Sequence, residues 1–166
     1  KLQLYPDIIK ILDDLTMKHI PLGICSSSPS LLHAKNALES LQIYDYFQAN
    51  LIIVKPSNNG KIDHLKTLLT LYNKYYNVNN SNTTNLKKKL NYKDVLFFDD
   101  MWYNVKKVKK EGVHAIKVNP DIGLNFKLYQ DSLKQYKERM NSSNIMCNFF
   151  TRKKKDDEVA KEAKTN

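Results

Sequence analysis

The stretch Val95-Leu96-Phe97-Phe98-Asp99-Asp100 (VLFFDD) runs four large apolar residues directly into two adjacent carboxylates. A short apolar run that ends in polar residues is typical of a buried strand in a parallel sheet. Neighbouring carboxylates repel each other, and burial increases that penalty, so we expect a compensating group. A divalent metal ion is one such group, but it needs further ligands. The other strand ends are therefore the places to search.

The composition is that of one globular domain. The chain has 166 residues, of which 42% are apolar and 10% aromatic, enough to bury a core. No apolar run approaches the ~20 residues of a membrane span, and a proline and charges interrupt the first residues, KLQLYPDIIK, where a secretory signal would be apolar. Two cysteines, Cys25 and Cys147, form no disulfide framework. We therefore expect a reducing, cytoplasmic location and no membrane partner.

The net charge of +10 comes from 25 lysines and only two arginines. Nucleic-acid recognition generally uses the bidentate guanidinium group of arginine. Lysine and asparagine both have A-rich codons, so a biased genome accounts for much of this composition. The charge thus argues against a nucleic-acid partner. If one were bound, the lysines expected to contact it are Lys106, Lys107, Lys109, Lys110 and residues 153–155.

Helical and strand patterns alternate along the chain. Apolar residues recur every three or four positions in the predicted helices, whereas the predicted strands are short apolar runs. The predicted helices are residues 5–19, 28–41, 60–76, 101–112 and 124–140, and the predicted strands are residues 20–26, 49–55, 94–100 and 113–118. Pro6 suits the first turn of the first helix, and Ser28-Pro29 suits the start of the second. The alternation predicts an α/β fold with a parallel sheet covered by helices on both faces.

Two segments are expected to lie outside this fold. Residues 77–91 are rich in Asn and Lys and aperiodic, which is typical of a loop insertion. Residues 141–166 form a charged tail that we expect to be solvated. The predicted domain is therefore residues 1–140.

Polar residues follow the first two predicted strands. In open α/β sheets, ligands bind outside the carboxyl ends of the strands. Ser26 ends the first strand just before a helix, where a hydroxyl and backbone N–H groups can bind a phosphate oxygen. Lys61 begins a helix after the loop KPSNNG and can reach the same phosphate. The alternatives are a solvated Ser26 beside a helix cap, and one surface lysine among many.

The third strand ends in Asp99 and Asp100, and Asn104 follows one helical turn later. Such oxygen ligands suit Mg²⁺, which keeps several waters and binds substrate phosphate. The alternative for an Asp pair at this place is turn and helix capping. The order Ser, Lys, Asp-Asp argues against a response-regulator receiver, where the acidic pair comes first and the lysine last.

Five pieces of sequence carry a family resemblance: LYPDIIKILDDL, the serine that ends IPLGICS, IYDYF, GKIDH and VLFFDDMWYNVKKVKKEGV. They resemble the haloacid dehalogenase superfamily and, within it, the magnesium-dependent phosphatase 1 family, over residues 2–140 apart from the insertion. The resemblance implies a Rossmann-like, three-layer parallel sheet of haloacid dehalogenase type. It also implies an Mg²⁺-dependent phosphomonoesterase that works through an aspartyl-phosphate, acting on protein phosphotyrosine or on a phosphorylated small molecule such as a sugar phosphate.

The resemblance assigns roles to the residues at the strand ends. Ser26 and Lys61 are the catalytic residues present, and together with Ser27 they bind the phosphoryl group. Asp100 is expected to bind the metal directly, because Asn104 then falls at the superfamily's fourth-residue offset as a supporting residue. Asp99 is expected to act through water. His64, His114 and Cys25 are expected to be structural.

The chain departs from the family at two places. The nucleophilic Asp-x-Asp motif ends the first strand of the family's fold, upstream of LYPD, and this sequence begins at Lys1 with no such motif after an apolar run elsewhere. In the family that strand lies mid-sheet, so the fold is expected to lack its central strand as written. We expect either an upstream extension or a non-catalytic binding remnant whose strand comes from a partner or dimer mate; the isolated chain should be inactive. Ser27 replaces a family arginine, which affects substrate preference.

Overall fold

The computed structural model describes residues 2–75 and 89–142. The chain divides into two compact units, residues 1–129 and 130–166. The described part of the second unit is helical and continues a helix that begins at residue 126. Most of the predicted insertion and tail, together with Cys147 and the lysines at 153–155, lies outside the described residues.

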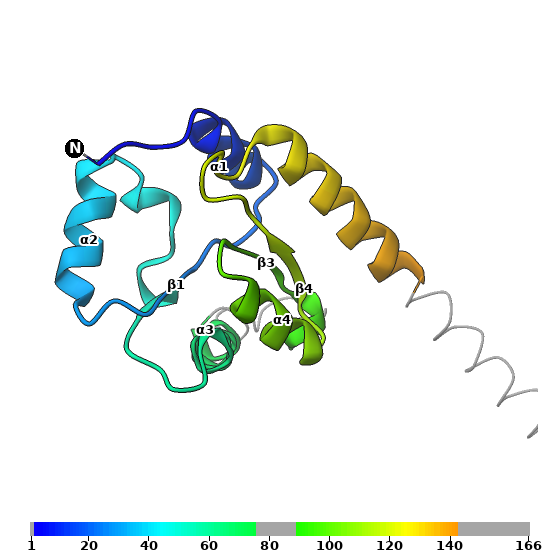
Figure 1. Ribbon diagram of the computed structural model, residues 1–166. Helices are drawn as coiled ribbons and strands as arrows, with labels where there is room; N and C mark the ends of the chain where they lie inside the picture. The colour runs from blue at the N-terminus through cyan, green and yellow to red at the C-terminus, as the bar shows by residue number, and fades with distance from the viewer. Residues whose placement is uncertain (1, 76–88, 143–166) are drawn as a thin grey trace, which may run out of the picture. The chain divides into compact units, whose positions relative to one another are not determined.

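The predicted alternation of helices and strands is confirmed (Figure 1). The elements are α1 (Ile8–Met17), β1 (Ile24–Ser26), α2 (Leu31–Ser40), η1 (Tyr44–Tyr46), η2 (Ala49–Leu51), β2 (Ile52–Val54), α3 (Lys61–Tyr75), η4 (Tyr92–Asp94), β3 (Leu96–Asp99), α4 (Trp102–Lys110) and β4 (His114–Lys117). The strands are shorter than the apolar runs that predict them. Among the described residues, no helix combines the length and the apolar character needed to cross a bilayer.

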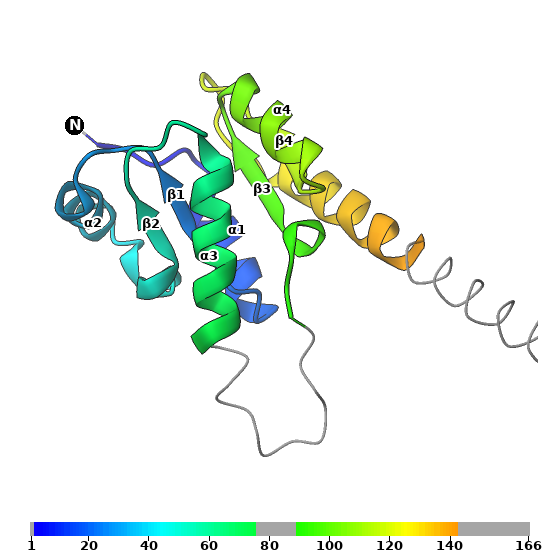
Figure 2. The ribbon, with the colours of Figure 1, turned by 90° about the horizontal axis from the view of Figure 1, so that it is seen from below.

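The strands form two separate parallel pairs instead of one continuous sheet. β1 pairs with β2 so that Cys25 lies opposite Ile53, and β3 pairs with β4 so that Phe98 lies opposite Ile116. In Figure 2, β1 and β3 are the inner strands and β2 and β4 the outer ones. Within the described part of the chain, the inner edges of β1 and β3 carry no neighbouring strand.

The predicted parallel pairing of VLFFDD is present, and the described part of the chain has no strand between β1 and β3, in agreement with the expectation of a fold that lacks its central strand as written. β3 has a strand on one side only, and each residue from Leu96 to Asp99 is half-buried. β1 is half-buried along its whole length as well, whereas Ile52 and Ile53 of β2 are buried. An apolar run indicates a strand that can be buried on both faces, but it does not show that both edges are paired.

Helices α3 and α4 join the two strand pairs. α3 contacts β1 and β2, α4 contacts β3 and β4, and the two helices contact each other. They share a core whose fully buried members are Leu65, Val105, Val108, Val113 and Ala115. Cys25 of β1 and Phe97 of β3 pack against that core from the two strand pairs. The carboxyl ends of β1 and β3 are thus held by one helix layer.

The start of α1 differs from the prediction. The helix begins at Ile8 with Asp7 as its N-cap residue, so Pro6 precedes the helix instead of lying in its first turn. The amide N–H of Phe126 donates to the Asp7 carboxylate at 2.8 Å. This bond connects the first helix to the segment that follows β4.

The start of α2 also differs, and the difference shapes the region after β1. The N-cap residue is Ser30, whose hydroxyl accepts a hydrogen bond from the amide of His33 at 3.2 Å. Ser28 was expected in that role. Instead, the hydroxyls of Ser26 and Ser28 accept the amide N–H groups two residues further on, at 3.2 and 3.4 Å. These consecutive turns compete with helical hydrogen bonding and delay the start of the helix by two residues.

Candidate active site

Ser26, Ser27 and Ser28, called here the serine turn, follow directly on β1. The Ser26 hydroxyl accepts the Ser28 amide, Ser27 is exposed, and Ser28 is half-buried. The turn therefore presents hydroxyl and amide groups at the carboxyl end of a parallel strand, where phosphate groups commonly bind in α/β proteins.

Lys61 reaches this turn from the first residue of α3. Its side chain is 8% exposed, and its ammonium group donates to the carbonyl oxygen of Cys25 at 2.8 Å and to the Ser27 hydroxyl at 3.4 Å. The structure thus brings together the lysine and the serine turn that the sequence singled out separately. A buried ammonium group beside hydroxyl groups is suited to bind an anion.

Asp99 ends β3 with a carboxylate that is held in place. It accepts the amide N–H of Met101 at 2.8 Å and two contacts from the side-chain amide of Asn104, both at 3.1 Å. Asn104 is only 3% exposed, whereas Asp100 is exposed. Asn104 therefore contacts Asp99, although its four-residue spacing had been used to favour Asp100.

The pKa of the Cys25 thiol depends on charged groups from α3 and from the other strand pair. Burial raises its pKa to about 12, the Lys61 ammonium acts in the opposite direction, and the Asp99 carboxylate raises it further. One side chain on β1 therefore experiences both the cation of α3 and the anion of β3. A thiol with this pKa stays protonated and does not act as a nucleophile at neutral pH.

The carboxylates can be tested as ligands of a metal ion. Among the described residues, no group of three His, Cys, Asp or Glu side chains could hold one. Mg²⁺ requires fewer protein ligands, because it usually keeps several waters and takes one or two carboxylates together with substrate phosphate. Asp99 and Asp100 fit that requirement by their chemistry.

Gly60 links the lysine to the carboxylates, and the sequence analysis missed it. Its φ angle is +65°, a conformation that favours glycine, and a Cβ atom there would lie 3.1 Å from Oδ1 of Asn104. That oxygen is buried and has no recorded hydrogen-bond partner. The signal available in the sequence was a glycine immediately before Lys61, a predicted site residue.

The loop before Gly60 is also tied to α3. The Ser57 hydroxyl donates to the Asp63 carboxylate at 2.7 Å, and this bond is the main reason why the pKa of Asp63 lies below its usual range. Asp63 lies in the first turn of the helix, where a negative charge is favourable. The loop and the helix start are thereby held together.

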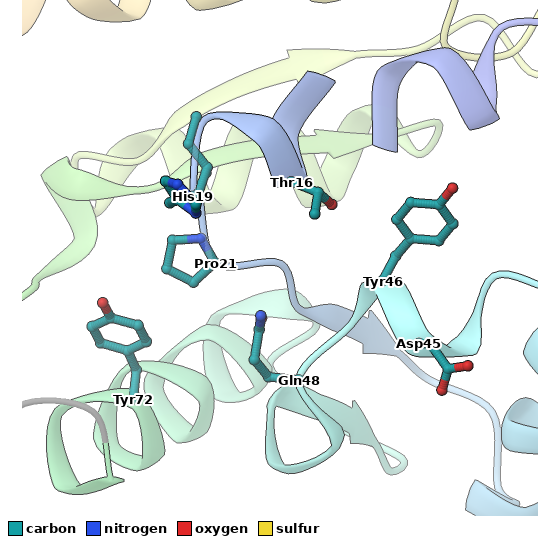
Figure 3. Close-up of a pocket in the computed structure, with 8 residues that line it drawn as sticks. Thr16, His19, Pro21, Asp45, Tyr46, Gln48 and Tyr72 are labelled. Atoms are coloured by element: carbon teal, nitrogen blue, oxygen red, sulfur yellow. The ribbon is translucent and has the colours of Figure 1, made fainter. Parts of the chain in front are cut away.

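A separate hollow of about 510 Å³ lies at the other end of the strands (Figure 3). Its lining residues are Thr16, His19, Ile20, Pro21, Asp45, Tyr46, Gln48 and Tyr72. Several of them precede β1, and Tyr72 lies three helical turns beyond Lys61, so the hollow includes no residue of the candidate site.

The lysines of α4 are exposed, on the side of the helix opposite the buried Val105 and Val108. They are Lys106, Lys107, Lys109 and Lys110. A role for them in nucleic-acid binding stays a prediction.

The parallel strand pairs and their helices are consistent with a haloacid dehalogenase-like α/β fold. The family model described as Acid Phosphatase matches residues 1–139, and the chain belongs to that family. No curated protein matches the sequence.

Proposed function

We propose that this chain forms the body of an Mg²⁺-dependent phosphomonoesterase of the magnesium-dependent phosphatase 1 type, working in the cytoplasm through an aspartyl-phosphate. The observation that supports it best is the placement of Lys61. Its ammonium group lies on the serine turn, and the nearby Cys25 thiol experiences both this cation and Asp99. Phosphoryl transfer depends mainly on positioning and charge neutralisation, which these groups can supply.

Each residue has a proposed task. The serine turn and Lys61 hold the oxygens of the transferring phosphoryl group. Asp100 and Asp99 hold Mg²⁺, with Asn104 fixing the orientation of Asp99. Bound Mg²⁺ supplies positive charge that neutralises the phosphoryl oxygens. Lys61 balances the remaining negative charge and orients the phosphorus for attack.

The nucleophilic aspartate is proposed to come from a strand between β1 and β3. Among the residues that the structure describes, no strand pairs with the inner edges of β1 and β3, and an unpaired edge inside a sheet leaves backbone N–H and C=O groups without partners. A parallel strand inserted there would join the two pairs into one sheet, in the order β2-β1-insert-β3-β4. This sheet would be the middle layer of the proposed three-layer fold. Residues outside the given sequence or a strand-donating partner, including a dimer mate, are the two sources to compare.

The proposed substrate is a phosphomonoester, either protein phosphotyrosine or a sugar phosphate. Ser27 replaces a bidentate guanidinium by a small hydroxyl beside the phosphate, which leaves less positive charge for an anionic substrate. The exposed Met101, Trp102 and Tyr103, which are 45%, 58% and 54% exposed, adjoin Asp100 and provide apolar surface next to the site.

Hydrolysis of p-nitrophenyl phosphate by the product of the complete reading frame tests this function. We expect activity that requires Mg²⁺ and that falls by at least about a hundredfold in Lys61→Ala and Asp100→Ala. Lys110→Ala, on the exposed side of α4, is the matched control and should retain activity. Activity that survives EDTA, or that survives both site substitutions, contradicts the proposal.

A second candidate function is a non-catalytic binding module. It is favoured by one observation: no Asp-x-Asp follows an apolar run in this sequence. A module of this kind binds phosphate at the serine turn but hydrolyses nothing with any divalent metal. The hydrolysis assay on the complete product separates the two candidates.

A further inference from the structure

We propose that His64 is a positioning residue of the phosphate site, which keeps the serine turn oriented while Lys61 engages the phosphate. The inference rests on the proposed function, because it assigns a task within the same site. His64 itself has no proposed contact with the phosphate. Its task is to hold the peptide groups that point toward it.

The imidazole ring of His64 is completely buried, with 0% of the residue exposed. Nε2 lies 2.8 Å from the carbonyl oxygen of Ser26 and 2.9 Å from that of Lys55. Nδ1 lies 3.0 Å from the carbonyl oxygen of Gly60. The ring therefore contacts three backbone segments: the end of β1, the end of β2 and the residue before α3.

All three partners of the ring are carbonyl oxygens, which only accept hydrogen bonds. A neutral imidazole carries a single N–H, and we assign it to Nε2, which faces two of these oxygens, so that Nε2 donates toward Ser26 and Lys55. The Ser26 carbonyl also accepts the amide of Lys55 at 3.1 Å, the last bond between the two strand ends. The His64 ring thus closes the β1-β2 pair at the point where the serine turn begins.

Because the peptide bond is planar, the contact of His64 with a carbonyl group also fixes the orientation of the adjoining amide N–H group. The carbonyl of Ser26 and the N–H of Ser27 belong to one planar trans peptide group, so fixing the carbonyl also fixes the direction of the N–H. His64 therefore sets the direction of the Ser27 amide donor at the proposed phosphate site.

Lys61 holds the neighbouring peptide group through the carbonyl of Cys25. Two of its three N–H donors are engaged with the Cys25 carbonyl and the Ser27 hydroxyl, so a bound phosphate takes the third and competes with the longer bond to Ser27. The His64 bond to Ser26 takes no part in this competition, so it holds the end of β1 in both the free and the phosphate-bound protein.

A purely structural role makes a different prediction. A buried histidine that serves only stability lowers the free energy of unfolding when replaced, but leaves the phosphate affinity of the folded protein unchanged. A positioning role lowers the phosphate affinity of the folded protein itself.

The test measures binding of inorganic phosphate to the chain by calorimetry and by amide chemical shifts, in the presence of Mg²⁺. His64→Leu removes all donors at similar size, and we expect about tenfold weaker binding, the effect of losing one to two hydrogen bonds. His64→Gln keeps an amide N–H donor on a more flexible side chain, so we expect about threefold weaker binding. His33→Leu, the same substitution at an exposed histidine, is the control and should bind as the original protein does.

The outcomes separate this inference from the proposed function. If Lys61→Met and His64→Leu both weaken binding, both proposals are supported. If Lys61→Met weakens binding and the two His64 variants match the original protein, the inference about His64 is overturned and the proposed function stands. If Lys61→Met leaves binding unchanged, the proposed function fails, and the inference falls with it. Should His64→Leu not fold, the affinity of His64→Gln decides, and an unchanged value overturns the inference.

Discussion

Gly60→Ala tests whether the loop before α3 and the support of Asp99 form one unit. Gly60 has a positive φ angle, and the added Cβ atom would lie 3.1 Å from Oδ1 of Asn104. Asn104 has little freedom to move away, because its amide group holds Asp99 through two contacts of 3.1 Å. The substitution should therefore cost stability and disturb the carboxylate together.

The magnitude has two parts. Placing a non-glycine residue in the left-handed region costs about 1–2 kcal/mol. Moving Asn104 weakens a hydrogen bond to a charged acceptor, of which the whole is worth about 1.5–3 kcal/mol, so a partial loss adds about 1 kcal/mol. Gly112 provides the matched control, since its φ angle is +94° and a Cβ atom there meets nothing within 4 Å. Gly112→Ala should show only the first part.

Urea unfolding of the two variants measures the difference. We expect Gly60→Ala to lower the free energy of unfolding by about 1 kcal/mol more than Gly112→Ala does. The effect of alanine on the unfolded chain is common to both and cancels. If the two variants lose the same free energy of unfolding to within ~0.3 kcal/mol, the usual deviation between independent sites, the reasoning is refuted. Asn104 would then not be fixed by Asp99.

Three further predictions concern the same region. Ser30→Ala should lower the free energy of unfolding by about 1 kcal/mol, and Ser28→Ala by clearly less, because Ser30 is the N-cap of α2; urea unfolding measures both. The raised pKa of Cys25 should make the free energy of unfolding fall between about pH 9 and pH 12, because the unfolded thiol ionises first and the folded one retains its proton. The fall should reach up to about 1.4 kcal/mol per pH unit relative to Cys25→Ala. Identical pH profiles of unfolding for the two proteins contradict this. Asn104→Leu should weaken Mg²⁺ binding about tenfold by releasing Asp99, as calorimetry can show, and an unchanged affinity excludes Asn104 as a support.

The sequence predicts the order of helices and strands correctly because that order depends on local periodicity. The 3.6-residue pattern of α3 and the apolar run before Asp99 are visible in any short window of residues. The pairing of strands depends on distant segments. Within the described residues, β1 and β3 are half-buried and pair on one side only, whereas their composition indicates strands that can be buried on both faces.

The candidate site was predictable as a set of residues but not as a geometry. The positions of Ser26, Lys61 and Asp99 at the ends of strands or the start of a helix follow from the fold class. The contact of Asn104 with Asp99 depends on how α4 starts at Trp102, which spacing alone does not determine. The burial of His64 likewise depends on packing between α3 and the strand ends, although its position three residues after Lys61 placed it on the same side of the helix.

Amide chemical shifts of the chain during titration with phosphate and Mg²⁺ test the central claim most directly. The account predicts that phosphate shifts the resonances of the serine turn and Lys61 most strongly, and that Mg²⁺ shifts those of Asp99 and Asp100. Shifts that instead concentrate on the exposed lysines of α4, with the serine turn unaffected, would contradict it.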